Sequence, residues 1–464
     1  MWKYLLIPLL SCCCACSQTG RIVGAKPNDL QVSKDLEVLF NHRQQTGYRS
    51  PISQQWRPGD DLEQALIKAI NSAETEILMA MQELSLPSVA HALIKAKNKG
   101  VVVQVVLENN YSGPWSEQSI TNLTSHQRQR RNRLLRLADQ DGDGVTTPAE
   151  AARGDAIALL LDAGVPIIDD TEDGSRGSGL MHHKFLVIDQ KIVLTGSANT
   201  TSSGIHGDAG AASTRGNVNH LLRLTSKALA KLFRDEFHRL WGDGPGGQHD
   251  SRFGLQKQSG PAQSAQVGDV NVQVLFSPHS KSNPGHGLNF LEEHLSKAKH
   301  RIDLALFVFS AQQLADVLRE RAEAGVQIRV IADPGFASRP FSEVLDLLGV
   351  ALPDQNCTLE QGNTPFQRPL RGVGTPRLAR GDKLHHKFAV IDNKTVVTGS
   401  FNWSPAAAHT NDETLLVVHS PQLAKHFTRE MDRLWDTAEL GITPRLQRKL
   451  DRQKIRCRDG VERR

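Results

Sequence analysis

Two histidine–lysine pairs are the residues of this chain best suited to chemistry on a phosphate. Residues 182–199 read HHKFLVIDQKIVLTGSAN, and residues 385–402 read HHKFAVIDNKTVVTGSFN. Thirteen of the eighteen aligned positions are identical, where chance gives about one. Both copies follow the spacing H-x-K-x4-D-x6-G-S-x-N. The chain therefore contains an internal duplication that repeats imidazole, ammonium, hydroxyl and amide groups.

The repeated motif predicts a β-hairpin. An apolar run (185–188) is followed by a polar turn (190–191) and a second apolar run (192–195), as in two strands joined by a tight turn. The histidine and the lysine lie two positions apart, so they face the same side of a strand. The Gly-Ser-x-Asn segment then ends the return strand at the same place. Two such sets form an oxyanion pocket suited to phosphate, made of His182, Lys184, Asn199, His385, Lys387 and Asn402.

Two imidazoles in one pocket suit a two-step displacement at phosphorus. One histidine attacks and forms a covalent phosphohistidine. The other protonates the leaving alcohol and then deprotonates the water that releases the product. We expect no cofactor for catalysis, because the lysine and asparagine donors stabilise the charge.

The flanks of the two motifs repeat as well. Residues 76–81 match 301–306, and residues 100–106 match 325–331, at a constant offset of 225. Each pair of apolar runs encloses a helical stretch that ends at glycine, and this strand–helix–strand order predicts α/β domains. We expect one half at residues 35–245 and the other at 269–440. Residues 246–268, rich in Gly, Gln, Ser and Pro, read as a flexible linker.

The duplicated motif resembles the phospholipase D superfamily, and the likeness covers both halves. The resemblance implies two α/β halves, each a mixed sheet flanked by helices, packed about a pseudo-twofold axis with one active site at the seam. It also implies a phosphodiesterase in which His182 is the nucleophile and His385 the acid and base. Two half-sites in one chain make a monomer sufficient. The supporting residues, for phosphate binding or bracing, are Ser197, Ser400, Asp189 and Asp392.

The two halves differ beyond the motif, where relatives often place a carboxylate that orients a catalytic histidine. The second half has Glu413 there, and the first half has Asn219. We expect Glu413 to take this role, the alternative being an exposed strand residue. The first half has no carboxylate at this position, so either Asp208 takes its place or the first histidine has no carboxylate partner. The neighbours His183 and His386 face the opposite side of each strand, and we expect them to be packing residues.

An insertion in the first half contains a calcium-loop pattern. Residues 139–150 read DQDGDGVTTPAE, which fits D-x-D-x-D-G-x5-E, the EF-hand loop. The alternative is an acidic, glycine-rich surface turn. We expect a structural Ca²⁺ at the rim of the pocket, bound by Asp139, Asp141, Asp143, the main-chain carbonyl of Val145, and Glu150.

The N-terminus and the cysteines indicate an exported protein. Residues 1–16 contain an early lysine, an apolar run (5–10) and four cysteines, which is typical of a signal peptide. The order Leu9-Leu10-Ser11-Cys12 resembles a bacterial lipoprotein box, with Cys16 as a second candidate; the alternatives are a wrongly assigned start or a metal-binding cysteine patch. We therefore expect a periplasmic, secreted or lipid-anchored protein. The remaining pair, Cys357 and Cys457, is predicted to form a disulfide.

Composition excludes several classes of protein. The chain has 464 residues, of which 39% are hydrophobic and 23% charged, so wholesale disorder is excluded. No apolar run approaches the roughly 20 residues that span a bilayer. The net charge is +5, yet residues 444–464 alone contain nine Lys/Arg and three Asp/Glu. The basic charge therefore lies in a tail (441–464), which we expect to be solvated and frayed.

The sequence favours phospholipid as the substrate, although other phosphodiesters stay open. Basic clusters suit a nucleic-acid backbone or lipid headgroups, and export places the protein beside a membrane, where it associates peripherally or through a lipid. We interpret the chain as a phospholipase D-type hydrolase. The alternatives are an exported nuclease, a cardiolipin synthase or hydrolase-like enzyme, and a non-catalytic surface binding protein. The clusters are Arg128, Arg130, Arg131, Arg133 and Arg136, then Arg368, Arg371, Arg377, Arg380 and Lys383.

Overall fold

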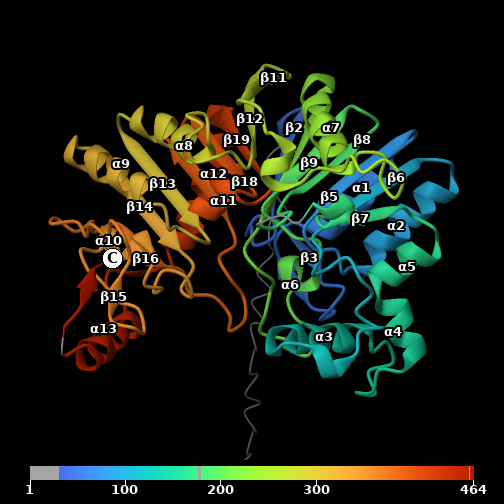
Figure 1. The fold of residues 1–464 in the computed structure, drawn as a ribbon, viewed down its shortest axis with the longest axis horizontal. Helices are drawn as coiled ribbons and strands as arrows, with labels where there is room; N and C mark the ends of the chain where they lie inside the picture. The colour runs from blue at the N-terminus through green and yellow to red at the C-terminus, as the bar shows by residue number, and fades with distance from the viewer. Residues whose placement is uncertain (1–30, 176–178, 459, 464) are drawn as a thin grey trace, which may run out of the picture.

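Two sheets, one in each half of the chain, form the frame of the molecule (Figure 1). The computed structural model describes residues 31–175, 179–458 and 460–463. The predicted signal peptide, residues 1–16, lies outside the described residues, so it stays a prediction. No helix among the described residues combines the length and apolar character that crossing a bilayer requires.

The first half comprises β1 (Gln31–Ser33), β2 (Leu36–Phe40), β3 (Gly47–Arg49), β4 (Trp56–Pro58), α1 (Leu62–Asn71), β5 (Glu76–Met81), α2 (Pro87–Asn98), β6 (Val102–Leu107), η2 (Ile120–Asn122), α3 (Ser125–Ala138), α4 (Pro148–Gly154), α5 (Ala156–Asp162), β7 (Ile167–Asp169), η3 (Glu172–Gly174), β8 (Lys184–Ile188), β9 (Ile192–Gly196), α6 (Ser202–Ile205), β10 (His220–Thr225) and α7 (Lys227–Trp241).

The remainder comprises η4 (Gly254–Lys257), β11 (Gln263–Val267), β12 (Val270–Ser277), α8 (Gly287–Ser296), β13 (Arg301–Leu306), α9 (Gln312–Glu323), β14 (Gln327–Ala332), α10 (Glu343–Leu347), β15 (Thr358–Leu359), β16 (Val373–Thr375), β17 (Lys387–Ile391), β18 (Thr395–Gly399), α11 (Pro405–His409), β19 (Glu413–His419), α12 (Pro421–Trp435), β20 (Glu439–Leu440), α13 (Pro444–Arg456) and β21 (Glu462–Arg463).

The two sheets share one order over eight strands, and the second has β20 as an additional edge strand. The first runs β1-β2-β10-β9-β8-β5-β6-β7, and the second runs β11-β12-β19-β18-β17-β13-β14-β16-β20. In each, the strand that begins with the motif lysine lies antiparallel to the strand before the crossover helix: β8 to β5, and β17 to β13. β5 and β13 in turn pair in parallel with β6 and β14. The predicted pair of mixed α/β halves is confirmed.

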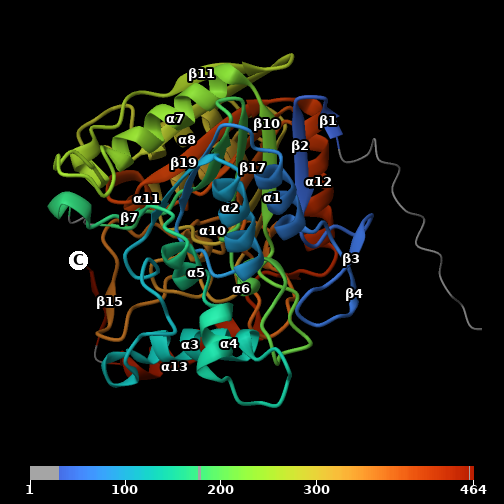
Figure 2. The ribbon, with the colours of Figure 1, turned by 90° about the vertical axis from the view of Figure 1, so that its right-hand side faces the viewer.

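Among the described residues, three large apolar cores and a small cluster around Trp115 stabilise this arrangement. The central core lies between the sheets and takes residues from both halves, including α7 and α12. On α12, Leu423, Phe427, Met431 and Leu434 recur at the spacing of one helix face and are buried. The outer faces of the sheets are covered by α1, α2 and α5 in the first half and by α8 and α9 in the second (Figures 1 and 2). The shared core fixes the halves against each other.

Each motif crosses the seam at its start. The N–H of His182 donates to the carbonyl of Asp412 at 2.9 Å, and the N–H of His385 donates to the carbonyl of Val218 at 3.1 Å. Isolated bridges pair Met181 with Asp412 and Val218 with Leu384. Each catalytic candidate is therefore positioned by backbone of the opposite half.

The predicted flexible linker is wrong in its inner part. β11 pairs with β12 along five residues, and Phe253, Lys257 and Val267 are buried. Phe253, Ala265 and Val267 of this polar segment pack into the central core, and its lysine lies between buried carboxylates. The segment is thus a built part of the seam.

The predicted fraying of the basic tail is also wrong. Residues 444–456 form α13, which begins with the cap Thr443 and Pro444, an arrangement that suits a helix start. Leu446 joins the outer core of the second half. The predicted disulfide between Cys357 and Cys457 is present and ties the end of the helix to the loop before β15. Apolar anchoring on one side and a covalent bond at the end hold the helix in place.

Candidate active site at the seam

A cavity of about 450 Å³ lies at the seam, where the two motifs meet. Its lining includes His182 and Asn199 of the first motif and His385 and Asn402 of the second. The hairpins β8–β9 and β17–β18 position these side chains, because each hairpin begins and ends at the seam. The structure therefore brings four of the six predicted pocket residues to the cavity wall, while Lys184 and Lys387 are not among its lining residues.

His182 is oriented by a carboxylate from the other half. Its Nδ1 lies 2.7 Å from Oε2 of Glu413, and Glu413 is fully buried. Ser400 donates to the same carboxylate at 2.6 Å, and Asn411 donates to its other oxygen at 3.3 Å. A carboxylate acceptor fixes the proton on Nδ1 and leaves Nε2 free with its lone pair. Glu413 is therefore not an exposed strand residue.

His385 is oriented by neutral acceptors only. Its Nδ1 lies 3.0 Å from both the carbonyl of Ser197 and Oδ1 of Asn219. Asn219 donates its own amide hydrogens to the carbonyls of Gly204 and Asn217, which directs Oδ1 toward the imidazole. Asp208, the predicted substitute, accepts from Ser203 instead. The first half thus supplies an amide where the second supplies a carboxylate.

The two motif lysines are almost wholly buried beside the histidines. Lys184 donates to the carbonyl of His182 at 2.8 Å and to Gln82 at 3.2 Å. Lys387 donates to the carbonyl of His385 at 2.7 Å and lies over the ring of Phe307. Burial lowers the pKa of Lys184 to about 7, although the Glu413 carboxylate opposes this. Burial, together with Lys184, also lowers the pKa of Lys387.

The remaining ionisable groups respond to the same burial. Burial lowers the pKa of both His182 and His385 well below 6.5, and the two motif lysines add to this. Burial also raises the pKa of Glu413 to about 7, while Lys184 opposes the rise. A dry site with two lysines disfavours further positive charge and favours a bound anion.

The floor of the cavity is polar on one side and aromatic on the other. Asn199 donates to Gln82 at 3.2 Å, while the equivalent position in the second half is Phe307, whose ring packs against His385. Among the described residues, Oδ1 of Asn199 and Oδ1 of Asn402 are buried without a hydrogen-bond partner. Such orphaned polar atoms are costly unless a ligand meets them, so they mark contact points for a polar group.

The supporting residues of the motif lie away from the cavity. Ser197 and Ser400 are fully buried, and their hydroxyls donate to Asn219 and Glu413. They therefore position the residues that orient the histidines, and their hydroxyls do not face a phosphate. Asp189 and Asp392 lie at the hairpin turns, where their carboxylates accept from the backbone before β5 and β13; the donors are Glu74, Thr75, Glu76, Lys299, His300 and Arg301.

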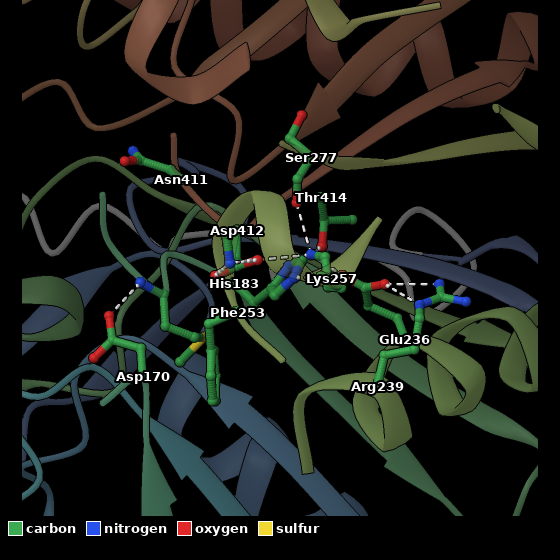
Figure 3. A network of polar contacts seen from close by, with 12 residues as sticks. Asp170, His183, Glu236, Arg239, Phe253, Lys257, Ser277, Asn411, Asp412 and Thr414 are labelled. Atoms are coloured by element: carbon green, nitrogen blue, oxygen red, sulfur yellow. Dashed lines mark hydrogen bonds and ion pairs between the residues drawn. The ribbon is translucent and has the colours of Figure 1, made fainter. Parts of the chain in front are cut away.

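A second layer of buried charge lies at His183, the chain neighbour of His182 (Figure 3), and no sequence motif predicts it. Lys257 donates to Glu236, to Asp412 at 2.7 Å and to the carbonyl of Ser277 at 2.7 Å. Glu236 also contacts His183 Nε2 at 3.1 Å. Lys257 thus offsets the negative charge of two buried carboxylates, Glu236 on α7 and Asp412 just before β19. A lysine in a segment otherwise read as linker was the only signal that could have pointed to it.

The other half repeats this layer without the lysine. His386 Nε2 lies 3.0 Å from Glu430, and Arg433 donates to the same carboxylate. His386 and His183 are fully buried, as expected for packing residues, but both also join hydrogen-bonded networks. In the first half Arg239 likewise donates to Glu236, so the His–Glu–Arg unit is part of the duplication, and Lys257 is an addition to the first copy.

The rim of the cavity is basic on the side of the insertion. His126, Arg130 and Arg133 of α3 line it, together with Lys383 from the loop before the second motif. Arg130 pairs with Glu83 at 2.7 Å. Arg377 and Arg380 line a neighbouring cavity instead. Of the two predicted basic clusters, the one on α3 contributes Arg130 and Arg133 to the cavity lining, and the one before the second motif contributes Lys383.

The acidic loop after α3 has part of a metal-binding arrangement. Carboxylate oxygens of Asp139, Asp141 and Asp143 lie within 4.8 Å of one another. Glu150 lies outside this group, because its oxygens accept from the backbone of Gln140 and Thr147. Val145 donates its N–H to Asp143. Three hard oxygen ligands on a tight loop fit Ca²⁺, whereas Glu150 serves as a helix cap.

Comparison with known proteins agrees with this geometry. The model of a family described as "Cardiolipin synthase, PLD-like domain" matches residues 66–241 and 291–435. The chain belongs to this phospholipase D-like family. A similar protein from Chlamydomonas reinhardtii, named mitochondrial cardiolipin hydrolase, is 26% identical over 199 residues that cover 39% of this chain and 80% of that protein.

Other phospholipase D-like proteins show the same relationship. A Rickettsia typhi protein named phospholipase D is 26% identical over 157 residues, which cover 34% of this chain and 64% of that protein, a little under two thirds. The solved structure of a phosphatidylserine synthase from Haemophilus influenzae is 12% identical, with a TM-score of 0.53, over 91% of this chain and 96% of that chain. That likeness extends the shared fold to both halves. The chain is a phospholipase D-like phosphodiesterase.

Proposed function

We propose that this phosphodiesterase hydrolyses phospholipids through a covalent phosphohistidine on His182. The observation that supports this assignment most directly is the 2.7 Å contact between His182 Nδ1 and the buried Glu413 carboxylate. An N-phosphorylated imidazole that keeps its Nδ1 proton is cationic, and a carboxylate acceptor stabilises it. His385, with neutral acceptors on Nδ1, lacks that stabilisation and suits proton transfer.

The reaction then runs in two balanced steps. Burial and the two lysines lower the pKa of His385, but a bound phosphodiester anion offsets the two lysines and favours a protonated His385. Nε2 of His182 attacks phosphorus and forms the P–N bond, while the bond to the leaving oxygen breaks and His385 gives that oxygen its proton. Next, His385 takes a proton from water, the water oxygen bonds to phosphorus, and the P–N bond breaks. Lys184 and Lys387 neutralise the phosphoryl oxygens in both steps.

The choice of phospholipid rests on several supports. Curated relatives are named cardiolipin hydrolase and phospholipase D, and a structural neighbour that covers 91% of the chain is a phosphatidylserine synthase. The predicted signal peptide adds a location beside a membrane, in the periplasm, outside the cell or at a lipid anchor. A nuclease activity is the second candidate, favoured by the basic rim of Arg130, Arg133 and Lys383.

We also propose a structural Ca²⁺ at the acidic loop. Asp139, Asp141 and Asp143 would bind the ion, with the carbonyl of Val145. Glu150 would join only after leaving its cap. The ion would order the turn between α3 and α4 and would take no part in the reaction.

Purified protein offered phosphatidylcholine, cardiolipin and DNA side by side, with and without a chelator, tests the function. We expect headgroup or phosphatidate release from a phospholipid, unchanged by the chelator, and a loss of at least about 10⁴-fold in His182→Ala. The exposed His91→Ala variant is the matched control and should keep full activity. Cleavage of DNA alone would replace the phospholipid assignment with the nuclease one, and cleavage that survives in His182→Ala would reject the site.

A further inference from the structure

Two basic helices lie at the same edge of the molecule. α3 contains five arginines, one histidine and no acidic residue, and α13 contains six Lys/Arg and one aspartate. Both helices lie at the lower edge of the fold in Figure 1 and again in Figure 2, which is rotated by 90° about the vertical axis. α3 belongs to the insertion in the first half and α13 to the tail of the second, so this shared edge does not follow from the duplication.

α13 is attached along one side only. Leu446 is buried in the outer core, Lys449 donates to the carbonyl of Ser338, and Gln453 donates to the carbonyls of Pro353 and Asp354 at 2.9 and 2.7 Å. The disulfide at Cys457 fixes its end. These contacts recur at helical spacing, so the opposite side of the helix faces solvent.

The solvent side of α13 is both basic and apolar. Arg448, Arg452 and Ile455 are exposed, and their i, i+4, i+7 spacing places them on one stripe. Ile455 is 63% exposed, and Leu440 and Ile442, just before the helix, are 47% and 43% exposed. Large apolar side chains among arginines are costly in water but suit the interface of a bilayer.

The attached side of α13 adjoins a cavity that borders the catalytic cavity. A second cavity of about 670 Å³ is lined by Arg445 and Leu446 of α13 and by apolar side chains that include Val344, Leu348 and Leu378. It shares Gly381 and Lys383 with the lining of the catalytic cavity. A lipid held at α13 would therefore lie next to the site that cleaves it.

We propose that the outer side of α13, defined by Arg448, Arg452, Lys454 and Ile455, is a docking surface for an anionic phospholipid bilayer, and that α3 contacts the same bilayer. The proposal rests on the proposed function insofar as the substrate is a phospholipid. The arginines attract the anionic headgroups, and the isoleucine enters the headgroup boundary. The catalytic cavity then opens toward its substrate.

A bilayer fits this surface better than a nucleic acid. Single strands bind on aromatic side chains that stack on bases, and α13 with the segment before it, residues 439–456, contains no aromatic residue. Exposed isoleucine and leucine add nothing to a contact with phosphates alone, whereas they gain free energy at a bilayer interface.

The test is vesicle co-sedimentation of the triple variant Arg448→Glu, Arg452→Glu, Lys454→Glu, which leaves the cavity-lining Arg445 intact. The matched control is Lys95→Glu, Lys227→Glu, Lys425→Glu, three exposed lysines on α2, α7 and α12. On phosphatidylcholine vesicles containing phosphatidylglycerol, we expect the α13 variant to partition at least about 100-fold more weakly than wild type. The control should stay within about twofold of wild type, and Ile455→Ser should weaken binding while keeping the charge.

Cleavage of soluble bis(4-nitrophenyl) phosphate separates this proposal from the proposed function. All variants should cleave it at the wild-type rate, since none alters the catalytic site. Failure of wild type to cleave it would reject the proposed function and leave the vesicle result standing. Equal vesicle binding by the α13 variant and wild type would overturn the docking surface. If the α13 variant lost binding to DNA but bound vesicles like wild type, this would also overturn the docking surface for a bilayer. The outer side of α13 would then be a nucleic-acid site.

Discussion

His182 and His385 have the same sequence context but different chemical partners. Glu413 accepts from His182 at 2.7 Å, and the equivalent residue Asn219 accepts from His385 at 3.0 Å. An exchange of carboxylate for amide therefore distinguishes the partners of the two imidazoles, and on it rests the proposal that the nucleophile and the acid–base lie in different halves.

Replacement of Glu413 by glutamine tests this division. The amide keeps the volume, but it can donate to Nδ1 and favour the wrong tautomer of His182. We expect kcat to fall on the order of 10²- to 10⁴-fold with little change in KM, measured on bis(4-nitrophenyl) phosphate. The exposed Glu320→Gln variant is the control. A Glu413→Gln enzyme with normal kcat would show that the carboxylate is not needed.

The pH dependence of kcat/KM follows from two buried groups whose pKa values both lie at about 7. Burial raises the pKa of Glu413, so its carboxylate is lost as pH falls through about 7. Burial lowers the pKa of Lys184, so its positive charge is lost as pH rises through about 7. We expect a narrow bell centred near pH 7. A flat profile from pH 5 to 9 would be incompatible with these shifts, and Glu413→Gln should remove the acidic limb.

At the scale of elements, the sequence predicts what depends on local spacing. The hairpins, the side shared by histidine and lysine and the repeated strand–helix–strand units follow from periods of two and 3.6 residues. The partner of His182 does not follow from local spacing, because Glu413 lies 231 residues away and reaches His182 only across the seam. The contact of Lys257 with Asp412 joins residues 155 apart. Because residues 246–268 are mostly polar, their composition predicts a solvated linker and not a buried lysine.

Lys257 is expected to stabilise the seam from inside the former linker. Lys257→Met leaves Glu236 and Asp412 buried without their shared cation, and loss of one member of a buried ion network costs about 3–5 kcal/mol. Urea unfolding should show this loss. The exposed Lys231→Met variant, which breaks a surface pair with Asp235, should unfold like wild type. Similar unfolding of both variants would show that the network adds no stability.

The disulfide is expected to act locally on α13. In a Cys357→Ser, Cys457→Ser double variant, the last turns of the helix lose their covalent attachment, while Leu446 still anchors the start. Hydrogen exchange should therefore speed up in residues 448–456 and stay unchanged in β17 and β18. Unchanged exchange throughout α13 would mean that the helix is held by its packing alone.

At the scale of the whole molecule, the duplication explains the frame and the additions explain what is particular to this chain. The same strand order recurs in both sheets, and one site forms where the repeats meet. The insertion with α3 and the tail with α13 have no counterparts in the other half. Their surfaces could be foreseen as basic, but their common edge required the three-dimensional arrangement (Figures 1 and 2).

Calcium is expected to stabilise the insertion without affecting the reaction. A single loop of this type should bind with a Kd on the order of 10⁻⁴–10⁻³ M, and binding to the folded state raises Tm. Calorimetric titration should give one site per chain, lost in Asp139→Asn, Asp143→Asn, while cleavage of bis(4-nitrophenyl) phosphate stays constant. No heat on titration of wild type would remove the calcium site.

The central claim is that His182 forms the covalent bond to phosphorus, and mass spectrometry of the His385→Ala variant tests it most directly. With bis(4-nitrophenyl) phosphate the first leaving group needs no proton, so the first step proceeds, whereas the second step lacks its base and the intermediate accumulates. After a quench at alkaline pH and digestion, we predict a nitrophenyl-phosphoryl adduct on His182, with a stoichiometric burst of nitrophenol. An adduct on a different residue, or a burst without any adduct, would contradict the mechanism.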